Sequence, residues 1–511
     1  TAALRGRLPM HQRANLPPWL PRAGVLGAAL LLAPAAHAAR FGFADDAGKY
    51  ADDGGAAYFA DLRAAGATEN RITVVWDPDR PLAILDEGFL DRSLPVATAQ
   101  GIRVVFHVYP LGPTSITVKP DAAADFAAFL AKLAKAYPQV REYIVGNEPN
   151  QPRFWRPQYS PAGRALAASA YVDLLAKSYD ALKDVDPAIR VVGLGLSGRG
   201  NDLPLAPSNA STSPVRFLRD LGAAYRASGR TQPLMDELGL HLYPRSDRDS
   251  VLAGDRWPRA GIVNLARIKQ AIWDAFAGTA QPTVEQGLKL RIDELGWQAA
   301  VPASRRSAYH GRETAAATSE RAQADNYARA IGIAACDRSI SALYLLHLRD
   351  DPDLERYQSG VRRADGSARP AYAAVRAAAA RARRGCAGRQ VTWRHATRVV
   401  GARATFGLGA GVASWRRTSW GFNVTAGEEA SYVAAVFPAA TPRATVRRLA
   451  SQSSTGAVLT TVGRVRASWN PRLRFPRRAL EPGRYVYAVR LRASMNPRRT
   501  SMLVSRVFVV R

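Results

Sequence analysis

The sequence predicts an α/β protein, namely a (β/α)8 (TIM) barrel followed by an all-β sandwich. Short apolar runs alternate with helical patterns eight times between residues 40 and 384, which indicates a parallel sheet covered by helices. Eight such pairs over roughly 345 residues fit a closed barrel. After residue 388 the helical periodicity stops, and short β-rich runs punctuated by Gly and Pro take over. This change of pattern predicts a second, β-sheet domain.

The elements of the barrel are taken in chain order. The predicted strands are 40–44, 71–76, 102–109, 142–148, 189–195, 236–243, 288–294 and 340–347. The predicted helices are 55–65, 85–100, 121–137, 160–185, 213–226, 261–276, 319–338 and 370–384. Ser160 followed by Pro161 is the expected start of the fourth helix. A doubly wound open sheet is the alternative, but residues 43–48 lack the Gly-rich turn that usually follows its first strand.

Three segments are expected: a secretory signal at 1–38, the barrel at 39–387 and the sandwich at 388–511. Four arginines precede the apolar run 23–33, and Ala36-His37-Ala38 follows it, which is typical of a cleaved signal. An uncleaved anchor is the alternative, although the run is short for a bilayer. The mature protein is therefore expected to be extracellular, with no membrane span. The predicted sandwich strands are 390–393, 430–437, 484–491 and 502–510.

The chain is strongly basic, and most of the excess charge lies in its last quarter. The net charge of the 511 residues is +29. Residues 390–511 hold 21 Arg, no Lys, no Asp and 3 Glu, which gives +18. Such a domain could bind an acidic cell-surface polymer. A packing domain with a solvated, arginine-rich surface is the favoured alternative. Nucleic acid is not expected as a partner, because no basic-aromatic binding module stands out.

Two cysteines occur, Cys336 and Cys386. Export would allow a disulfide between them, and we predict that bond over two unrelated buried thiols. Two cysteines without a neighbouring histidine cluster do not make a zinc site. We expect neither a metal nor an organic cofactor.

The fourth predicted strand ends in Asn147-Glu148-Pro149. Proline cannot continue the ladder, so Glu148 is expected at the carboxyl end of a buried strand. The seventh strand ends in Glu294. Because barrel enzymes place their chemistry at these strand ends, the two glutamates are expected to face each other across one mouth. Paired carboxylates are what glycoside cleavage requires.

Other polar and aromatic side chains are expected at the same mouth. Trp155 and Trp297 follow the two glutamates closely and could stack on a sugar ring, with core packing as an equal alternative. Asp293 adjoins Glu294, and since successive strand side chains alternate, only one of the two is expected to face the mouth. The remaining candidates at strand ends are Arg71, His107, Tyr109, His241, Tyr243 and His347.

Gly146-Asn-Glu-Pro149, His241-x-Tyr243 and Ile292-Asp-Glu-Leu-Gly-Trp297 together resemble clan A of the glycoside hydrolases, of the cellulase-like family 5 and xylosidase-like family 39 type. The resemblance spans residues 40 to about 384. It implies that Glu148 is the acid/base and Glu294 the nucleophile.

The resemblance also implies supporting roles. Asn147 would bind the sugar 2-hydroxyl, Tyr243 would donate to Glu294, and Arg71 would pair with that same carboxylate. His107 and His241 would line the subsite. The chain departs from the cellulase-like pattern at strand eight, where Leu345-Leu-His-Leu348 stands in place of a tryptophan. His347 could take that place.

The sequence thus predicts a secreted retaining glycosidase acting on β-linked oligo- or polysaccharides. A non-catalytic carbohydrate-binding or cell-surface protein on the same barrel is the alternative. An extracellular nucleic-acid binder is a weaker third hypothesis, based on the basic sandwich alone.

Overall fold

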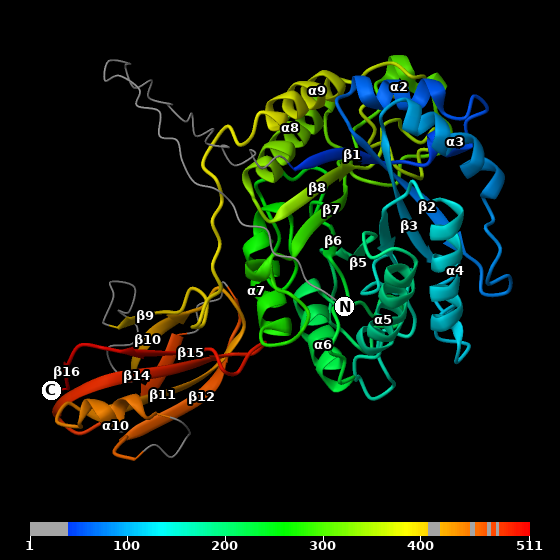
Figure 1. Cartoon of the computed structure of the whole chain (residues 1–511). Helices are drawn as coiled ribbons and strands as arrows, with labels where there is room; N and C mark the ends of the chain where they lie inside the picture. Colours follow the sequence, from blue (N-terminus) through cyan, green and yellow to red (C-terminus); the bar gives the residue numbers. More distant parts are fainter. Residues whose placement is uncertain (1–38, 407–418, 450–454, 468–471, 477–479, 511) are drawn as a thin grey trace, which may run out of the picture. The chain divides into compact units, whose positions relative to one another are not determined.

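A computed structural model describes residues 39–406, 419–449, 455–467, 472–476 and 480–510 (Figure 1). The expected signal segment, 1–38, lies outside these residues. Within the part that is described, no helix is long and apolar enough to cross a membrane.

Residues 40–383 form a closed barrel in which eight parallel strands pair in chain order, β1 to β8, and β8 pairs with β1 (Figure 1). This confirms the predicted fold class. The strands are Arg40–Ala44 (β1), Glu69–Trp76 (β2), Arg103–Pro110 (β3), Glu142–Val145 (β4), Arg190–Ser197 (β5), Glu237–His241 (β6), Lys289–Leu295 (β7) and Ile340–Leu345 (β8). The helices are Ala47–Tyr50 (α1), Ala56–Ala64 (α2), Glu87–Ala99 (α3), Ala122–Ala136 (α4), Ala167–Val185 (α5), Pro214–Ala227 (α6), Leu265–Phe276 (α7), Glu320–Cys336 (α8) and Pro370–Arg383 (α9).

The predicted start of the fourth long helix is wrong. Ser160 does cap a structure, because its hydroxyl accepts from the Arg164 N–H at 3.1 Å, but that structure is a turn. Gly163 in this turn has φ +77°, which a helix does not allow. Helix α5 therefore begins only at Ala167.

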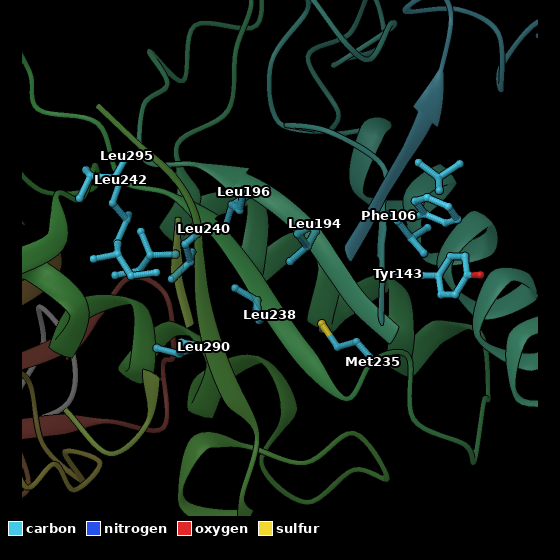
Figure 2. Close-up of a cluster of buried hydrophobic side chains, with 14 of the residues drawn as sticks. Phe106, Tyr143, Leu194, Leu196, Met235, Leu238, Leu240, Leu242, Leu290 and Leu295 are labelled. Carbon is cyan, nitrogen blue, oxygen red and sulfur yellow. The ribbon is translucent and has the colours of Figure 1, made fainter. Parts of the chain in front are cut away.

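Two apolar layers build the barrel, and they follow from alternation along each strand. Outward residues such as Tyr143, Val145 and Leu238 belong to one large cluster shared with the helices, part of which Figure 2 shows. The inward residues form a smaller cluster confined to the strands and their ends: Ala44, Val105, Ile144, Val192, Ala342, Tyr344 and Leu346. The small size of this inner cluster leaves both ends of the barrel interior to polar side chains.

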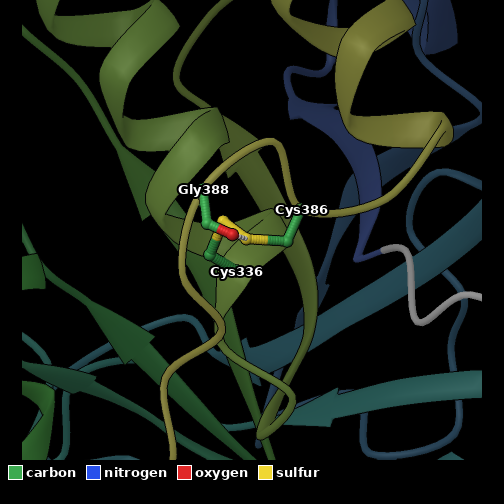
Figure 3. The surroundings of a disulfide bond; sticks show 3 residues. All are labelled: Cys336, Cys386 and Gly388. Atoms are coloured by element: carbon green, nitrogen blue, oxygen red, sulfur yellow. Dashed lines mark hydrogen bonds between the residues drawn. A yellow bond between two sulfur atoms is a disulfide. The ribbon is translucent and has the colours of Figure 1, made fainter.

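Cys336 at the end of α8 and Cys386 beyond α9 form a disulfide, with Cα atoms 4.6 Å apart (Figure 3). The predicted bond is confirmed. It joins the end of α8 to the segment that follows α9, and the two cysteines are 50 residues apart in sequence.

The C-terminal region is a β-sandwich of two antiparallel sheets, as predicted. One sheet has the order β13-β10-β9 and the other β12-β11-β14-β15, with β16 also pairing β14. Side chains of both sheets, such as Val424 and Val489, share one core. The elements are Arg403–Phe406 (β9), Ser419–Thr425 (β10), Ala430–Pro438 (β11), Arg443–Arg447 (α10), Leu459–Val465 (β12), Arg472–Pro476 (β13), Gly483–Ala493 (β14), Thr500–Val504 (β15) and Phe508–Val510 (β16).

Two sandwich predictions are corrected. The run 390–393 is not a strand, since only Val391 makes a bridge, to Asp337 of the barrel. The run 502–510 is two strands, β15 and β16. The predicted boundary between 387 and 388 falls in the segment that connects α9 to β9.

Candidate active site

Glu148 stands on a sharp turn at the carboxyl end of β4. Gly146 has φ +79° and Glu148 itself has φ +39°, a conformation that costs a non-glycine residue energy. The surroundings hold this turn in place: the Glu148 N–H donates to the Gly195 carbonyl at 3.0 Å. Asn150 is fully buried and its amide donates to the carbonyls of Ser197 and Thr212. The strained turn is therefore fixed by the next strand and its loop.

Glu294, at the end of β7, accepts hydrogen bonds from two donors. Arg71 donates to Oε1 at 2.7 Å, and the Tyr243 hydroxyl donates to Oε2 at 2.8 Å. Burial favours the protonated carboxyl, but the charges of His241 and Arg71 outweigh it and hold the pKa of Glu294 down at about 2. Glu294 is thus a carboxylate over the whole physiological pH range.

His107 has a defined tautomer. Its Nδ1 lies 2.6 Å from an Arg71 guanidinium nitrogen, which can only donate, so Nδ1 accepts. Its Nε2–H therefore donates to the Gly146 carbonyl at 3.0 Å. Burial and the neighbouring Arg71 charge lower the pKa of His107 well below 6.5, which agrees with a neutral ring. His107 thus links the arginine to the turn that carries Glu148.

His241, at the end of β6, lies between the two glutamates. Its Nδ1 is 3.0 Å from Glu148 Oε1 and 3.4 Å from Glu294 Oε2. Because both distances start from the same nitrogen, the two carboxylate oxygens are at most 6.4 Å apart, the sum of those distances. Burial disfavours the cation, but the charges of Glu294 and Asp293 raise the pKa of His241 to about 10. His241 is therefore an imidazolium.

Some polar atoms at the mouth could form further hydrogen bonds. Asn147 is 8% exposed, and its Oδ1 has no hydrogen-bond partner in the part of the chain that is described. The side chains of Glu148 and Glu294 are each 16% exposed, so both reach the solvent from a largely buried position. A ligand with hydroxyl groups could satisfy these oxygens.

Both tryptophans are core residues, which corrects their expected stacking on a sugar. Trp155 is 3% exposed and packs edge-on against Tyr171, with ring centroids 5.7 Å apart. Trp297 is 1% exposed, packs edge-on against Tyr327, and donates its Nε1–H to the Asp249 carbonyl. Proximity in sequence to a glutamate did not place either ring at the mouth.

Two tyrosines lie at the mouth instead: Tyr109, which was expected at the end of the third strand, and Tyr357, which the sequence analysis missed. Tyr357, in the loop after β8, is 45% exposed. Burial raises the pKa of its hydroxyl above the ordinary value, and the charges of Glu294 and Glu148 act in the same direction. His347 contacts this ring edge-on, with centroids 6.2 Å apart. Tyr109, at the end of β3, packs on His107 at 5.0 Å. Tyr109 lay in the run assigned to the third strand, whereas nothing in the pattern marked Tyr357.

Asp293 is the other residue whose place differs from expectation. Alternation on β7 puts Arg291 and Asp293 inward, and the pairing of β7 with β8 shifts register between Ile292 and Leu295. This irregularity lets Glu294 join Asp293 on the inner side. Asp293 is fully buried and its Oδ2 lies 3.4 Å from His241 Nε2. Both carboxylates therefore contact His241, from opposite ring nitrogens.

The site is built from carboxyl groups, imidazoles, an arginine and a tyrosine. In the described part of the chain, no group of three or more His, Cys, Asp or Glu side chains is arranged to hold a metal ion. The fold and the site together define a (β/α)8 barrel with a pair of carboxylates at the carboxyl ends of β4 and β7.

Similarity to known proteins was found among solved structures alone. No family model matches the sequence. No curated protein matches it either. Among solved structures, a family 39 glycoside hydrolase from Bacteroides cellulosilyticus WH2 has a TM-score of 0.47 and 15% identity, covering 85% of this chain and 81% of its own. A GH5_18 protein from Streptomyces cattleya, solved with GlcNAc, has 0.47 and 16%, covering 71% and 84%.

A third similar structure belongs to a longer protein. It is a calcium-binding mutant of β-glucuronidase 2 from Bacteroides uniformis, with a TM-score of 0.42 and 10% identity. The match covers 93% of this chain and 45% of that one, so this chain spans less than half its length. The function proposed next rests on the geometry of this chain's own site.

Proposed function

We propose that this protein is a retaining glycoside hydrolase that cleaves β-linked sugars, with Glu148 as acid/base and Glu294 as nucleophile. The observation that carries the proposal is the upper limit of 6.4 Å between their nearest carboxylate oxygens. Retaining enzymes hold the two carboxyl groups about 5–5.5 Å apart, and inverting enzymes about 6.5–9.5 Å apart. The limit falls below the inverting range.

Each step of the reaction has a residue suited to it. Glu294, ionised and aligned by Arg71 and Tyr243, attacks the anomeric carbon, while Glu148 gives its proton to the departing glycosidic oxygen. Water, deprotonated by Glu148, then releases the sugar from Glu294, which leaves as a carboxylate. Asn147 Oδ1 accepts from the sugar 2-hydroxyl, and the contact strengthens as positive charge develops at the anomeric carbon.

The surroundings proposed for this reaction are extracellular. The segment 1–38 would direct secretion and be removed, and the substrate would be an oligo- or polysaccharide outside the cell. The basic sandwich would bind an acidic surface polymer. These proposals rest on the signal pattern and on the +18 charge of residues 390–511.

The test uses the mature protein with the variants Glu148→Gln and Glu294→Gln on a panel of aryl β-glycosides. Glu294→Gln is expected to abolish turnover with every leaving group. Glu148→Gln is expected to lose about 10²–10⁴-fold with poor leaving groups and much less with acidic phenols, which depart without a proton. Wild-type-like hydrolysis by either variant with a poor leaving group would refute the assignment of the two glutamates. Absence of hydrolysis by the unmutated protein would leave a carbohydrate-binding role.

A further inference from the structure

Asp293 is a buried carboxylate for which the proposed reaction has no use. It is fully buried, and neither of its oxygens accepts a hydrogen bond within the ordinary limits from the part of the chain that is described. Burying a charge without compensation is unfavourable, so a carboxylate in this position needs a cation. The nearest one is His241, whose Nε2 lies 3.4 Å from Asp293 Oδ2.

The barrel interior is shaped around this pair. A Cβ atom on Gly239, one strand away, would lie 3.0 Å from both Asp293 oxygens. A Cβ atom on Gly195 would lie 3.1 Å from His241 Nε2, and Gly195 has φ +50° in the irregular part of β5. Two glycines on adjacent strands therefore clear the space that the carboxylate and the imidazole occupy.

Charged and titratable groups face His241 from several strands. Glu148 and Glu294 face its Nδ1, and Asp293 faces its Nε2. From β3, the neutral ring of His107 lies edge-on at 6.4 Å. From β2, the Arg71 guanidinium is bonded to Glu294. Three carboxyl groups and one arginine therefore surround His241.

Only one of those three carboxyl groups keeps the same state throughout the proposed reaction. Glu294 becomes an uncharged ester in the glycosyl-enzyme, and Glu148 alternates between acid and carboxylate. Asp293 takes no part in bond making or breaking. Burial acts to raise the pKa of Asp293, but the charges of His241 and Arg71 outweigh it and lower that pKa below its ordinary value, so Asp293 stays ionised.

We propose that Asp293 is the permanent counter-ion of His241, and that it keeps this imidazole cationic when Glu294 is esterified, so that the Nδ1–H continues to position Glu148 for the second half-reaction. This inference rests on the proposed glycosidase reaction. Asp293 acts through His241 and is a positioning residue. Its effect should therefore appear in the protonation of His241 and in the step that follows ester formation.

The direct test follows the imidazole by NMR in ¹⁵N-histidine-labelled protein, with the His241 signals identified by their loss in His241→Asn. Glu294→Gln imitates the uncharged ester and leaves Asp293 intact. His241 is expected to stay doubly protonated at pH 7.5 in this variant and to lose a proton in Asp293→Asn/Glu294→Gln, with a midpoint at least one pH unit lower. Asp350→Asn/Glu294→Gln, which removes a buried carboxylate paired with Arg369 outside the site, should leave His241 unchanged.

A neutral His241 at pH 7.5 in Glu294→Gln alone would overturn the proposal, and that result needs no Asp293 variant to fold. In Asp293→Asn, kcat for an activated aryl glycoside should fall at least tenfold at the basic limb of the pH profile while kcat/KM changes less. An equal loss in both at every pH would overturn it by showing a purely structural role. If the wild-type protein hydrolyses no glycoside, the proposed function fails, whereas the imidazole measurement still decides the pairing.

Discussion

The two ends of the barrel interior each hold a cluster of buried charges, and the clusters differ in how fully their charges are paired. At the amino ends of the strands, Arg291 bonds both Glu142 and Glu237, and Arg40 bonds Glu142 and Glu69. At the carboxyl ends, Asn147 Oδ1 has no partner among the described residues, and Glu148 has a strained backbone.

The difference separates a structural cluster from a reactive one. In the cluster at the amino ends of the strands, called the lower cluster from here on, Arg40 and Arg291 each pair with more than one carboxylate. In the cluster at the carboxyl ends, called the upper cluster, three carboxyl groups surround the His241 imidazole, and Asn147 Oδ1 can still accept a hydrogen bond. Such an arrangement stores strain and like-charge repulsion, which a bound substrate can relieve. The lower cluster should therefore govern stability, and the upper one activity.

The largest expected effect on stability comes from Arg291→Met. Removing this fully buried cation leaves two carboxylates short of a partner, which should cost about 3–5 kcal/mol of unfolding free energy in urea titrations. Arg190→Met is the matched control, because Arg190 also pairs Glu237 but is half exposed, and it should cost less than about 1 kcal/mol. Equal losses of unfolding free energy in the two variants would contradict the claim that a buried arginine stabilises the fold more than an exposed one.

Acid should act on the lower cluster in a defined window. Burial acts to raise the pKa of Glu142, but the charges of Arg291 and Arg40 outweigh it and lower that pKa to about 2. A depressed folded-state pKa contributes stability above the unfolded value near 4.5, and that stability is lost as the pH falls from there toward 2. Glu142→Gln should remove roughly 3 kcal/mol at pH 7 and flatten the acid dependence by the same amount. An unchanged slope between pH 4.5 and 2 would contradict this.

A smaller effect is expected from Tyr243→Phe in the upper cluster. Loss of the hydroxyl donor should raise the pKa of Glu294, so the acidic limb of kcat/KM should move to higher pH by up to about one unit, or roughly 1.4 kcal/mol. Unfolding free energy should change little. Tyr109→Phe, whose ring packs on His107 without bonding either glutamate, should leave that limb in place. A shift of equal size in both variants would point to a general change in the pocket.

Regular periodicity made the barrel predictable from the sequence. All eight strand–helix pairs were predicted, because apolar runs such as 142–145 and amphipathic patterns such as 122–136 are local signals. The exact start of helix α5 and the irregular strand pairings were not predicted. Helix α5 begins seven residues after Ser160 because that serine caps a turn. The register shift in β5 between Gly193 and Leu196 was not predicted, although glycine inside a strand often marks such a bulge.

The polar part of the site was predicted better than its walls. Arg71, His107, Glu148, His241 and Glu294 were all placed at one mouth, because strand ends of a parallel barrel converge there. Trp155 and Trp297 were misplaced, since loop paths decide which face of a ring is covered. Asp293 was set aside on simple alternation, and the irregular pairing of β7 brought it to His241 beside Glu294.

The most direct test of the central claim is the configuration of the first product. Proton NMR during the first minutes of hydrolysis of an aryl β-glycoside distinguishes the two anomers before mutarotation mixes them. Carboxylate oxygens at most 6.4 Å apart predict that the β-anomer appears first. Initial release of the α-anomer would show inversion and would contradict the assignment of Glu294 as nucleophile.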